Sequence, residues 1–371
     1  MKVNIVSYED PGLWIFGKFA KKLHEEVSRA GVQCALSREP DPAADINHHI
    51  SYINYRGEAR GADTLMITHV DTLHKLQMLK GQLAKAAMGI CMSRETQQKL
   101  VSSGLPADRL CYINPAHDGV IKPRPLVLGI TSKVHADGRK GEETIAALCK
   151  KISPLDFRFI IMGAGWKETA EKMRALGFGV DYYGDFDYGK YTELVPSFDY
   201  YLYISHDEGS MGFLDALSAG VQTMVTPQGY HLDAPGGLTL PVNDAEELAV
   251  ACLAIAAKRR ALPQSVASWT WPNYARKHID LWHRLLEGPS APRLPGEPYP
   301  DGTASLYTAE NAPAFTAAEA LAYKASLLKN SARTFYSYFP EGKISVPLLY
   351  GKAVKLAKRL LGLQDGGGVT P

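Results

Sequence analysis

The sequence has few cysteines, almost no net charge and no long apolar segment, and each shortage excludes a class of protein. Its five cysteines are widely spaced and form no Cys-x-x-Cys pair, which argues against a disulfide framework or a zinc site. The formal net charge of +2 gives no general argument for binding nucleic acid. The N-terminus follows a strand pattern rather than that of a signal peptide, and no run is as long as a membrane span. We therefore expect a cytoplasmic protein that meets a membrane, if at all, only at its surface.

What the chain does contain is a regular alternation of short apolar runs with longer segments of helical period. Strands separated by helices are typical of parallel, doubly wound α/β sheets. The segment "IKPRP" interrupts this alternation near residue 122, and a second series of the same kind follows it. The length of 371 residues suits two domains. We predict two similar α/β domains, 1–122 and 123–271.

The rest of the chain differs from these two series. An amphipathic helix with an aromatic face is predicted over 272–288, and we expect it to cross back to the first domain. Residues 289–371 form a proline-glycine linker followed by two helix candidates, 317–334 and 346–363. The second candidate is basic and amphipathic, so it either lies on an anionic membrane surface or packs its apolar stripe on the protein.

One strand-to-helix corner, "ISHDEGSMGFLDALSAG", is unusually rich in acids and glycine. The glycines free the backbone, the amides at the start of the helix are expected to point outward, and the acids are able to accept hydrogen bonds from sugar or ribose hydroxyls. The candidate ligand-binding residues are Asp207, Glu208, Gly209, Ser210, Met211, Gly212 and Asp215. The alternative is that an acid in the first helical turn only complements the helix dipole.

Two further strand-to-helix loops of the second domain carry groups suited to an anion. "GITSKVHADGRKG" supplies Ser132 with the cations Lys133, Arg139 and Lys140, which are able to surround a diphosphate or simply form a solvated basic loop. "MGAGW" places Gly163 directly after a strand, in a phosphate loop or a plain tight turn, since the third glycine of the dinucleotide fingerprint is missing. Ligands of open α/β sheets bind at such carboxyl ends of strands.

Histidines mark the strand ends of the first domain. His69 and Asp71 follow one predicted strand, and His48 and His49 lie in another. A lone histidine is more often structural than catalytic, but His69 falls where a ligand cleft is expected. No set of residues has the spacing of metal ligands and no nucleophile elbow is present, so we predict neither a metal site nor a hydrolase triad.

The order of these motifs resembles that of the retaining, nucleotide-sugar-dependent glycosyltransferases of the GT-B fold (family 4-like, glycosyl transferases group 1). The segments that carry the resemblance are "LGITSK", "RKG", "FIIMGAG", "VDYYGDF", "ISHDEGSMGFLDALSAG" and "SWTWPNYARKHIDLWHRLL". The segment "ICMSRETQQKLVSSGLPADRLCYINPAHD" looks like the end of the family's acceptor domain. The resemblance covers roughly residues 1–287. It implies two Rossmann-like domains that face each other across a cleft, followed by a helical tail outside the family pattern.

The resemblance assigns roles to several single residues. The family's donor-phosphate cations would correspond to Lys133 and Lys140, with Ser132 in the same loop and Gly163 in the separate "MGAGW" loop. The glycine loop that faces the diphosphate in this family resembles the region of Gly17. The family's histidine near the donor sugar, in the N-terminal domain, is matched best by His69.

The two acids of the family fall on the glycine-rich corner with a departure. In the family they are glutamates eight positions apart, whereas Glu208, which precedes a glycine as the family requires, stands only seven positions before Asp215. Asp207 restores the spacing and loses the glycine match, so the first acid is either Asp207 or Glu208. Asp215 replaces the second glutamate and would contact the ribose. The proline that usually follows this helix is absent.

The activity implied is transfer of a sugar, with retention, from a nucleotide-diphosphate donor to a saccharide or lipid-linked saccharide acceptor, in cell-surface polysaccharide or glycolipid synthesis. Such transfer relies on positioning and on stabilising a leaving diphosphate, so no metal or other cofactor is expected. Peripheral membrane contact is expected through the tail, and no nucleic-acid partner. A GT-B epimerase or phosphorylase and a non-catalytic GT-B binding protein stay open. A Rossmann oxidoreductase is disfavoured because it leaves the cationic loop and the acid corner unexplained.

Overall fold

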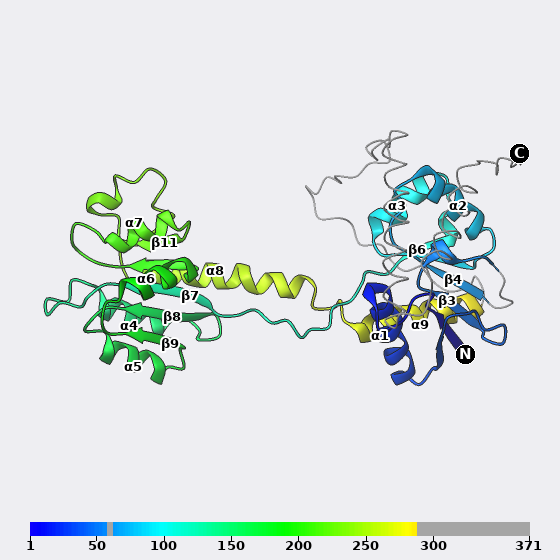
Figure 1. Ribbon diagram of the computed structural model, residues 1–371, viewed down its shortest axis with the longest axis horizontal. Coiled ribbons are helices and arrows are strands. Elements are labelled where there is room, and N and C mark those ends of the chain that lie inside the picture. Colours follow the sequence, from blue (N-terminus) through cyan, green and yellow to red (C-terminus); the bar gives the residue numbers. More distant parts are fainter. Residues whose placement is uncertain (58–61, 288–371) are drawn as a thin grey trace, which may run out of the picture. The chain divides into compact units, whose positions relative to one another are not determined.

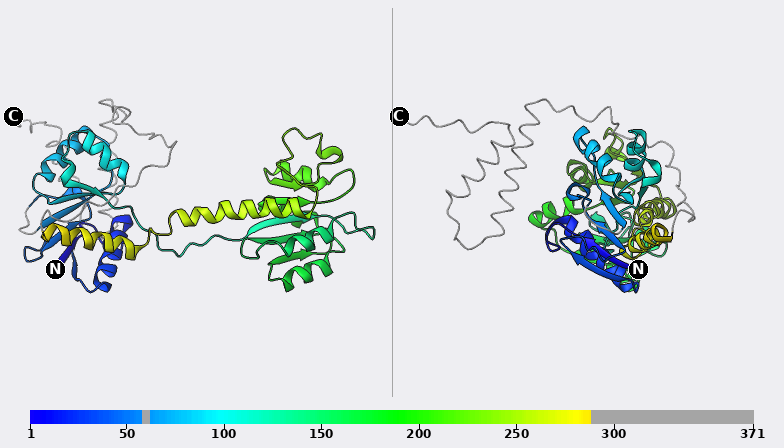
Figure 2. Two further views of the ribbon diagram at one scale, coloured as in Figure 1. Left: turned by 180° about the vertical axis from the view of Figure 1, so that it is seen from behind. Right: turned by 90° about the vertical axis from the view of Figure 1, so that its right-hand side faces the viewer.

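The computed structural model describes residues 1–57 and 62–287, which form two parallel β-sheets with helices between the strands (Figures 1 and 2). This two-domain α/β architecture confirms the predicted fold class. That the domains face each other across a cleft stays a prediction, as do the domain boundaries. The two helix candidates of the tail lie outside the described residues.

The first sheet has six parallel strands in the order β2-β1-β3-β4-β5-β6. Its strands are β1 (Lys2–Val6), β2 (Gln33–Ser37), β3 (Ile46–His49), β4 (Ala62–Ile67), β5 (Met88–Cys91) and β6 (Leu110–Tyr112). The helices that cover it are α1 (Trp14–Arg29), α2 (Leu73–Leu83), α3 (Arg94–Ser102) and α9 (Trp271–Glu287). One apolar core lies under α1 and α9 and another under α2 and α3, so both faces of the sheet are buried.

The second sheet also has six parallel strands, in the order β12-β11-β10-β7-β8-β9. Its strands are β7 (Leu126–Thr131), β8 (Phe157–Met162), β9 (Val180–Tyr183), β10 (Tyr200–Tyr203), β11 (Gln222–Val225) and β12 (Leu240–Pro241). Its helices are α4 (Glu142–Cys149), α5 (Lys167–Ala175), α6 (Tyr188–Leu194), α7 (Met211–Ser218) and α8 (Ala245–Ser265). α4, α5 and α8 pack on one face, and α6 and α7 on the other.

Each sheet has one place where the chain reverses the direction in which it adds strands. In the first sheet β2 lies on one side of β1 and all later strands lie on the other, so the reversal falls between β1 and β3. In the second sheet β8 and β9 lie on one side of β7 and β10 to β12 lie on the other, so it falls between β7 and β10. Loops diverge at such a switch point, which makes it the usual ligand site of open α/β sheets.

Several helices begin where the sequence provides a capping side chain, among them α3 and α6. The hydroxyl of Ser93 accepts the amide of Thr96 at 3.1 Å at the start of α3, and Asp187 accepts that of Lys190 at 2.7 Å at the start of α6. Each cap satisfies one of the amides that the first helical turn leaves without a partner. The caps thus fix where the strand-to-helix loops end.

The last described helix, α9, belongs to the core of the first domain although it follows the second domain in the sequence. It packs along α1, and the two helices lie side by side in Figure 2. Trp271 and Trp282 are buried on its apolar face, and Trp271 Nε1 donates to Asp118 at 2.8 Å. The first domain is therefore built from two separate stretches of the chain.

Helix α2 was not predicted. Its eleven residues, "LHKLQMLKGQL", have no clean apolar stripe, because a glutamine occupies one of its three buried positions, Leu79, Gln82 and Leu83. The Gln82 amide donates to the carbonyls of Tyr52 and Tyr55 at 2.6 and 3.1 Å, which is why a polar side chain is tolerated there.

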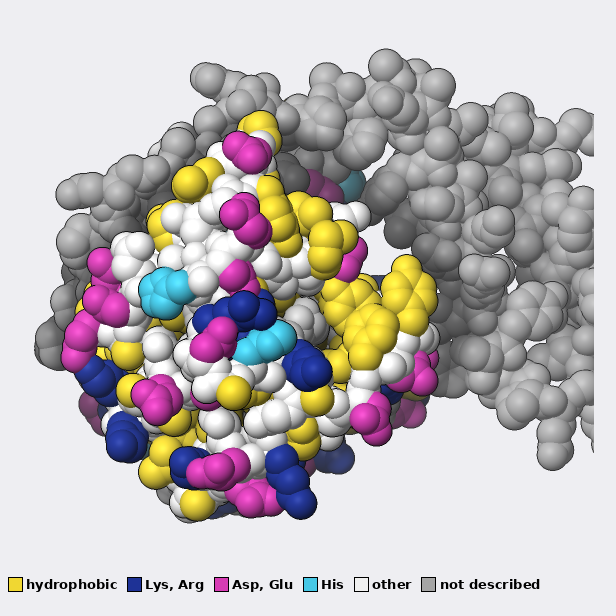
Figure 3. Space-filling view, turned by 90° about the vertical axis from the view of Figure 1, so that its left-hand side faces the viewer, with side chains coloured by type: hydrophobic (Ala, Val, Ile, Leu, Met, Phe, Trp, Pro, Cys, Tyr) yellow, Lys and Arg dark blue, Asp and Glu magenta, His cyan; other side chains and the backbone are white. Residues whose placement is uncertain are grey.

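Within the described residues no helix is both long and apolar enough to cross a membrane. Figure 3 shows one face of the second domain, on which basic, acidic and apolar side chains are interspersed. This mixture agrees with the small net charge of +2.

Candidate functional site

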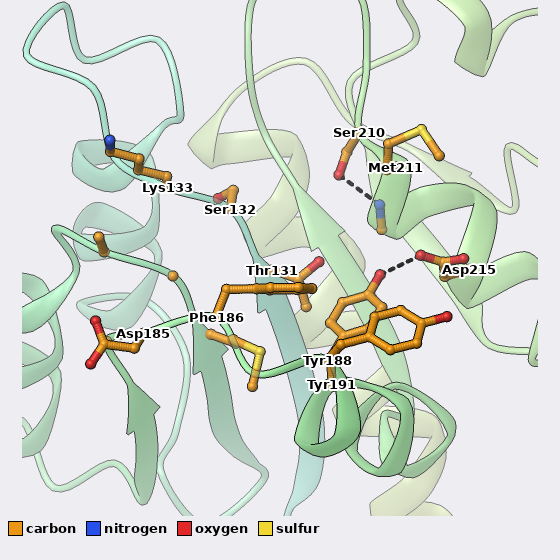
Figure 4. Close-up of a pocket in the computed structure, with 15 residues that line it drawn as sticks. Thr131, Ser132, Lys133, Asp185, Phe186, Tyr188, Tyr191, Ser210, Met211 and Asp215 are labelled. Carbon is orange, nitrogen blue, oxygen red and sulfur yellow. Dashed lines mark hydrogen bonds between the residues drawn. The ribbon is translucent and has the colours of Figure 1, made fainter.

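A pocket of about 420 Å³ opens at the switch point of the second sheet (Figure 4). The ends of β7 and β8 form its floor, the loop after β9 and helix α6 form one wall, and the start of α7 forms the other. Seven residues predicted from the sequence line it: Ser132, Lys133, Gly163, Ser210, Met211, Gly212 and Asp215. The structure thus brings residues from three separate loops together, whereas their contact with a donor stays a prediction.

Two of these glycines are required by close approaches of the backbone. A Cβ on Gly163, whose φ is 144°, would lie 2.1 Å from the carbonyl oxygen of Ser132. A Cβ on Gly212 would lie 2.2 Å from Thr131 Oγ1. Any side chain at either position would force the pocket floor apart, so the glycines have a structural reason that does not depend on a ligand.

The polar side of the pocket suits an anion. Ser132 Oγ is buried without a hydrogen-bond partner among the described residues, and the Lys133 side chain is exposed beside it. An unsatisfied hydroxyl and a solvated cation are able to bind a phosphate oxygen together. In Figure 4 these two residues lie across the pocket from Ser210 and Asp215.

A carboxylate on α7 meets aromatic rings from α6 and the loop before it, which sequence reasoning missed. The hydroxyl of Tyr191 donates to Asp215 Oδ2 at 2.5 Å. Burial and this hydrogen bond raise the pKa of Tyr191, so the phenol keeps its proton. Phe186 and Tyr188 are 66% and 70% exposed, and the Phe186 ring lies 5.4 Å from that of Tyr191. Exposed aromatic faces beside a carboxylate form a surface for a planar base and a hydroxylated sugar.

Lys140 and Asp207, both predicted ligand contacts, bind each other. Lys140 Nζ forms an ion pair with Asp207 Oδ2 and a hydrogen bond of 2.5 Å with the Tyr203 hydroxyl. Burial opposes the charge on Asp207, but hydrogen bonds from Lys140, the Gly209 amide and Tyr203 lower its pKa. Burial likewise lowers the pKa of Lys140, but its bonds to Asp207 and Tyr203 raise it overall. Both groups stay charged, and neither lines the pocket.

This ion pair sits where the cationic loop is fastened to the acid corner. The Arg139 carbonyl accepts the Ser205 hydroxyl at 2.7 Å and the His206 amide at 3.2 Å. Gly141, with φ of 72°, is pressed so closely on the end of β10 that a Cβ would lie 2.0 Å from the Ile204 carbonyl oxygen. The loop from Ser132 to Gly141 is therefore held against the corner by backbone contacts.

The corner amides, expected to point outward, are mostly bonded within the protein. The amide of Gly209 donates to Asp207 Oδ1 at 3.1 Å, that of Gly212 to Ser210 Oγ at 3.2 Å and that of Ser210 to His231 Nε2 at 3.0 Å. His231, fully buried, was not predicted, because nothing in the sequence connects it with Ser210, 21 positions away. Of the amides from Ser210 to Gly212, the described residues leave only that of Met211 without a partner.

Glu208, the other candidate for the first acid, has an exposed side chain outside the pocket lining. Its carbonyl accepts the Tyr230 amide at 3.2 Å, and a Cβ on Gly229 would lie 2.2 Å from the same oxygen. The backbone at Glu208 is thus fixed while its carboxylate is solvated. Asp207 is held by Lys140 instead, so the two acids differ in environment.

The two candidates of the first domain, His69 and Gly17, lie on different elements. His69 is exposed after β4, and its carbonyl accepts the Tyr52 hydroxyl at 2.8 Å. Gly17 lies buried inside α1, where a Cβ would be 2.6 Å from the Asp10 carbonyl oxygen, so packing explains this glycine. His48 and His49 are buried at the end of β3.

No cluster of three or more histidine, cysteine, aspartate or glutamate side chains suited to a metal occurs among the described residues. The five cysteines are unpaired.

Comparison with known proteins gave matches only among solved structures. No family model and no curated protein matches the chain. Among the structures are the lipopolysaccharide outer core galactosyltransferase WaaB (13% identity, 76% of this chain and 98% of that chain, TM-score 0.31) and sucrose-phosphate synthase from Thermosynechococcus elongatus (14%, 77% and 99%, 0.35). A third is Anabaena HepE in complex with UDP-glucose (13%, 77% and 96%, 0.29). These are GT-B glycosyltransferases. The fold of this chain is defined by its own strand order.

Proposed function

We propose that the chain is a GT-B glycosyltransferase that moves a sugar from a nucleotide-diphosphate donor to a saccharide or lipid-linked saccharide acceptor. The observation that carries this proposal is the second-sheet pocket. It joins an unsatisfied hydroxyl and a cation on one side to a carboxylate and exposed aromatic rings on the other. A nucleotide has the same sequence of chemical groups: diphosphate, ribose and planar base.

The groups fit such a donor in a definite order. Ser132 and Lys133 would bind the diphosphate, Asp215 would accept from the ribose hydroxyls, and Phe186 and Tyr188 would cover the base. The Lys133 charge would stabilise the leaving diphosphate. The Met211 amide at the start of α7 would lie beside the diphosphate as a second stabilising group.

The retaining course, the cell-surface or glycolipid pathway, the cytoplasmic location and peripheral membrane contact are part of the same proposal. The retaining course and the pathway derive from the family resemblance. The cytoplasmic location derives from the scattered cysteines and the N-terminal pattern, and the membrane contact from a basic amphipathic tail that lies outside the described residues. Either Asp207 or Glu208 would contact the donor sugar. For Asp207 to do so, its ion pair with Lys140 would have to open.

That ion pair favours a second candidate function, a GT-B protein that binds nucleotide sugars without turning them over. A carboxylate and a cation that form an ion pair with each other are both unavailable to bind the substrate. The two functions share the donor pocket and differ only in turnover, so one series of experiments separates them.

The experiment is a thermal-shift screen of the full chain with UDP, GDP, ADP and CDP, followed by the matching diphosphate sugars. A ligand that binds the native state raises the melting temperature with the logarithm of its concentration. We expect one nucleotide to stabilise the chain and Asp215→Ala to reduce that shift. NMR of the released sugar then tests turnover and shows whether the anomeric configuration is kept. The absence of any shift with all four nucleotides would refute both functions.

A further inference from the structure

Asp185 is a carboxylate in the lining of the second-sheet pocket to which the proposed function gives no role. It follows β9 by two residues and precedes Phe186 in the same lining. Other acids near this wall are already bonded, since Asp187 caps α6 and Asp215 accepts the Tyr191 hydroxyl at 2.5 Å. The exposed carboxylate of Asp185 forms no hydrogen bond or ion pair with the residues that the structure describes. Both of its oxygens are therefore available to a ligand.

The glycine before Asp185 leaves space beside this carboxylate. Gly184 does not have a positive φ, and the nearest atom to a Cβ built there is the Tyr182 hydroxyl at 3.2 Å, the far end of a side chain. Gly163, on the neighbouring strand-end loop of the pocket, is by contrast required by the Ser132 carbonyl. Backbone conformation thus does not explain the glycine at 184, whereas close approach of a ligand does.

The position of Asp185 in the pocket suits the base of a nucleotide. In Figure 4 Asp185 and Asp215 lie on opposite sides of Phe186. With the ribose at Asp215, a base that covers the Phe186 ring extends toward Asp185. The backbone amides of Asp185 and Phe186 donate to none of the described residues, so this loop offers hydrogen-bond donors next to the carboxylate.

The chemistry of a carboxylate decides which base fits. A carboxylate only accepts hydrogen bonds, so it favours a base edge that carries adjacent donors. Guanine presents N1–H and N2–H side by side, with the acceptor O6 next to them. Uracil has a single N3–H between two carbonyl oxygens, and cytosine and adenine each have an amino group beside an unprotonated ring nitrogen. Those oxygens and ring nitrogens repel a carboxylate, so only guanine pairs with it through two hydrogen bonds.

We infer that Asp185 makes the second-sheet pocket selective for guanine, so that the donor is a GDP-sugar. The Asp185 carboxylate accepts from N1–H and N2–H, a backbone amide of the same loop donates to O6, and the Phe186 ring covers the base. Asp185 is a specificity-determining residue and takes no part in the transfer itself. The inference rests on the proposed function, because it takes the pocket to bind a nucleotide.

The test measures the binding of GDP, IDP, UDP, CDP and ADP to the full chain by calorimetry. We expect GDP to bind more tightly than UDP by about 5- to 150-fold, the discrimination that one bidentate pair provides. IDP, which lacks the N2 amino group, should lie between them. Asp185→Asn places an N–H against a donor of guanine and should lower the ratio of GDP to UDP affinity by about tenfold. Equal affinity for GDP and UDP, or an unchanged ratio in Asp185→Asn, overturns the inference.

Asp187→Asn is the matched control. It removes the same charge two residues away, outside the pocket lining, and asparagine caps a helix as well as aspartate does. Loss of a negative charge near the diphosphate changes the affinity of all nucleotides alike, so only their ratio reports on the base. We expect Asp187→Asn to keep the wild-type ratio. An equal fall of the ratio in both variants would assign the effect to charge alone and overturn the inference.

Nucleosides separate this inference from the proposed function, because they contain the base without the diphosphate. Guanosine bound more tightly than uridine, with no turnover of any diphosphate sugar, supports selection of guanine and refutes glycosyl transfer. Turnover of a UDP-sugar at least as fast as that of the GDP-sugar with the same sugar does the reverse. If no nucleoside or nucleotide binds, both the inference and the proposed function are refuted.

Discussion

The two sheets share a parallel architecture but use their switch points in opposite ways. At the second, glycines allow close approaches, and an open pocket is lined by one cation, Lys133, by Asp185 and Asp215, and by exposed aromatic rings. At the first, the edge is acidic and the chemistry lies inside the sheet, where histidines and a carboxylate are buried. One backbone plan thus produces two edges of different chemistry, and the difference is made by the few residues that follow each strand.

The largest expected effect on the free energy of unfolding comes from a close backbone approach at the second switch point. Gly141 and Gly220 have φ of 72° and 74°, but only Gly141 has a backbone atom within 4 Å of a would-be Cβ. Gly220→Ala should cost about 1–2 kcal/mol through its backbone conformation alone. Gly141→Ala should cost about 4 kcal/mol, because the Ile204 carbonyl must also move. Urea unfolding of both variants gives the difference, and equal costs would show that the loop is not held by this contact.

The next effect concerns the buried histidines of the first domain. Burial lowers the pKa of His278 to about 4, and that of His48 lies well below its ordinary value because of burial and the neighbouring His278 and His49. A histidine with a lowered folded-state pKa contributes stability that is present above pH 6.5 and is lost as pH falls toward 4. We expect a loss of about 3 kcal/mol from His278 over this window.

This pH dependence is measured by urea unfolding of the first domain at a series of pH values. His278→Gln should be less stable at neutral pH and should lose less stability on acidification than the wild type. A parallel loss in both proteins would assign the acid sensitivity to other groups.

A smaller effect is expected from the ion pair between Lys140 and Asp207. Their side chains are 13% and 20% exposed, so removing one leaves a poorly solvated charge. Lys140→Ala should cost about 2 kcal/mol of stability, and the double variant with Asp207→Asn should cost less than the sum of the two single variants. Lys133→Ala is the control, since its exposed side chain should matter for nucleotide affinity and by less than about 0.5 kcal/mol for stability. If the stability losses of the two single variants simply add in the double variant, the ion pair contributes nothing to the free energy of unfolding.

The smallest effect on stability is expected at the pocket wall. Asp215→Ala should weaken nucleotide binding about tenfold and lower the free energy of unfolding by less than about 1 kcal/mol. Calorimetry with the nucleotide found in the thermal-shift screen measures the first, and thermal unfolding the second. Normal affinity with reduced stability would leave Asp215 as a partner of Tyr191 and of the helix dipole only.

The sequence was most informative where function and local structure use the same residues. Strand-length apolar runs separated by helical segments predicted both sheets, and the glycines and polar residues after β7, β8 and β10 predicted much of the pocket lining. The aromatic wall could not be predicted, because Tyr191 reads as an ordinary core residue of an amphipathic helix. Pairings between distant residues were also missed. Lys140 and Asp207 were both singled out, but spacing alone does not show that two candidates neutralise each other.

Because α9 packs in the core of the first domain, it affects how the protein folds during its synthesis on the ribosome. Residues 126–265 form a continuous unit that is complete when α8 emerges, whereas the apolar surface of α1 awaits a helix that ends at Glu287. The domain that begins the chain is thus the last to finish folding, against the usual order of synthesis. Until then Phe19 and Leu23 lack the cover that α9 provides. A nascent chain stalled before Trp271 should therefore carry a folded second domain beside an unfinished first one.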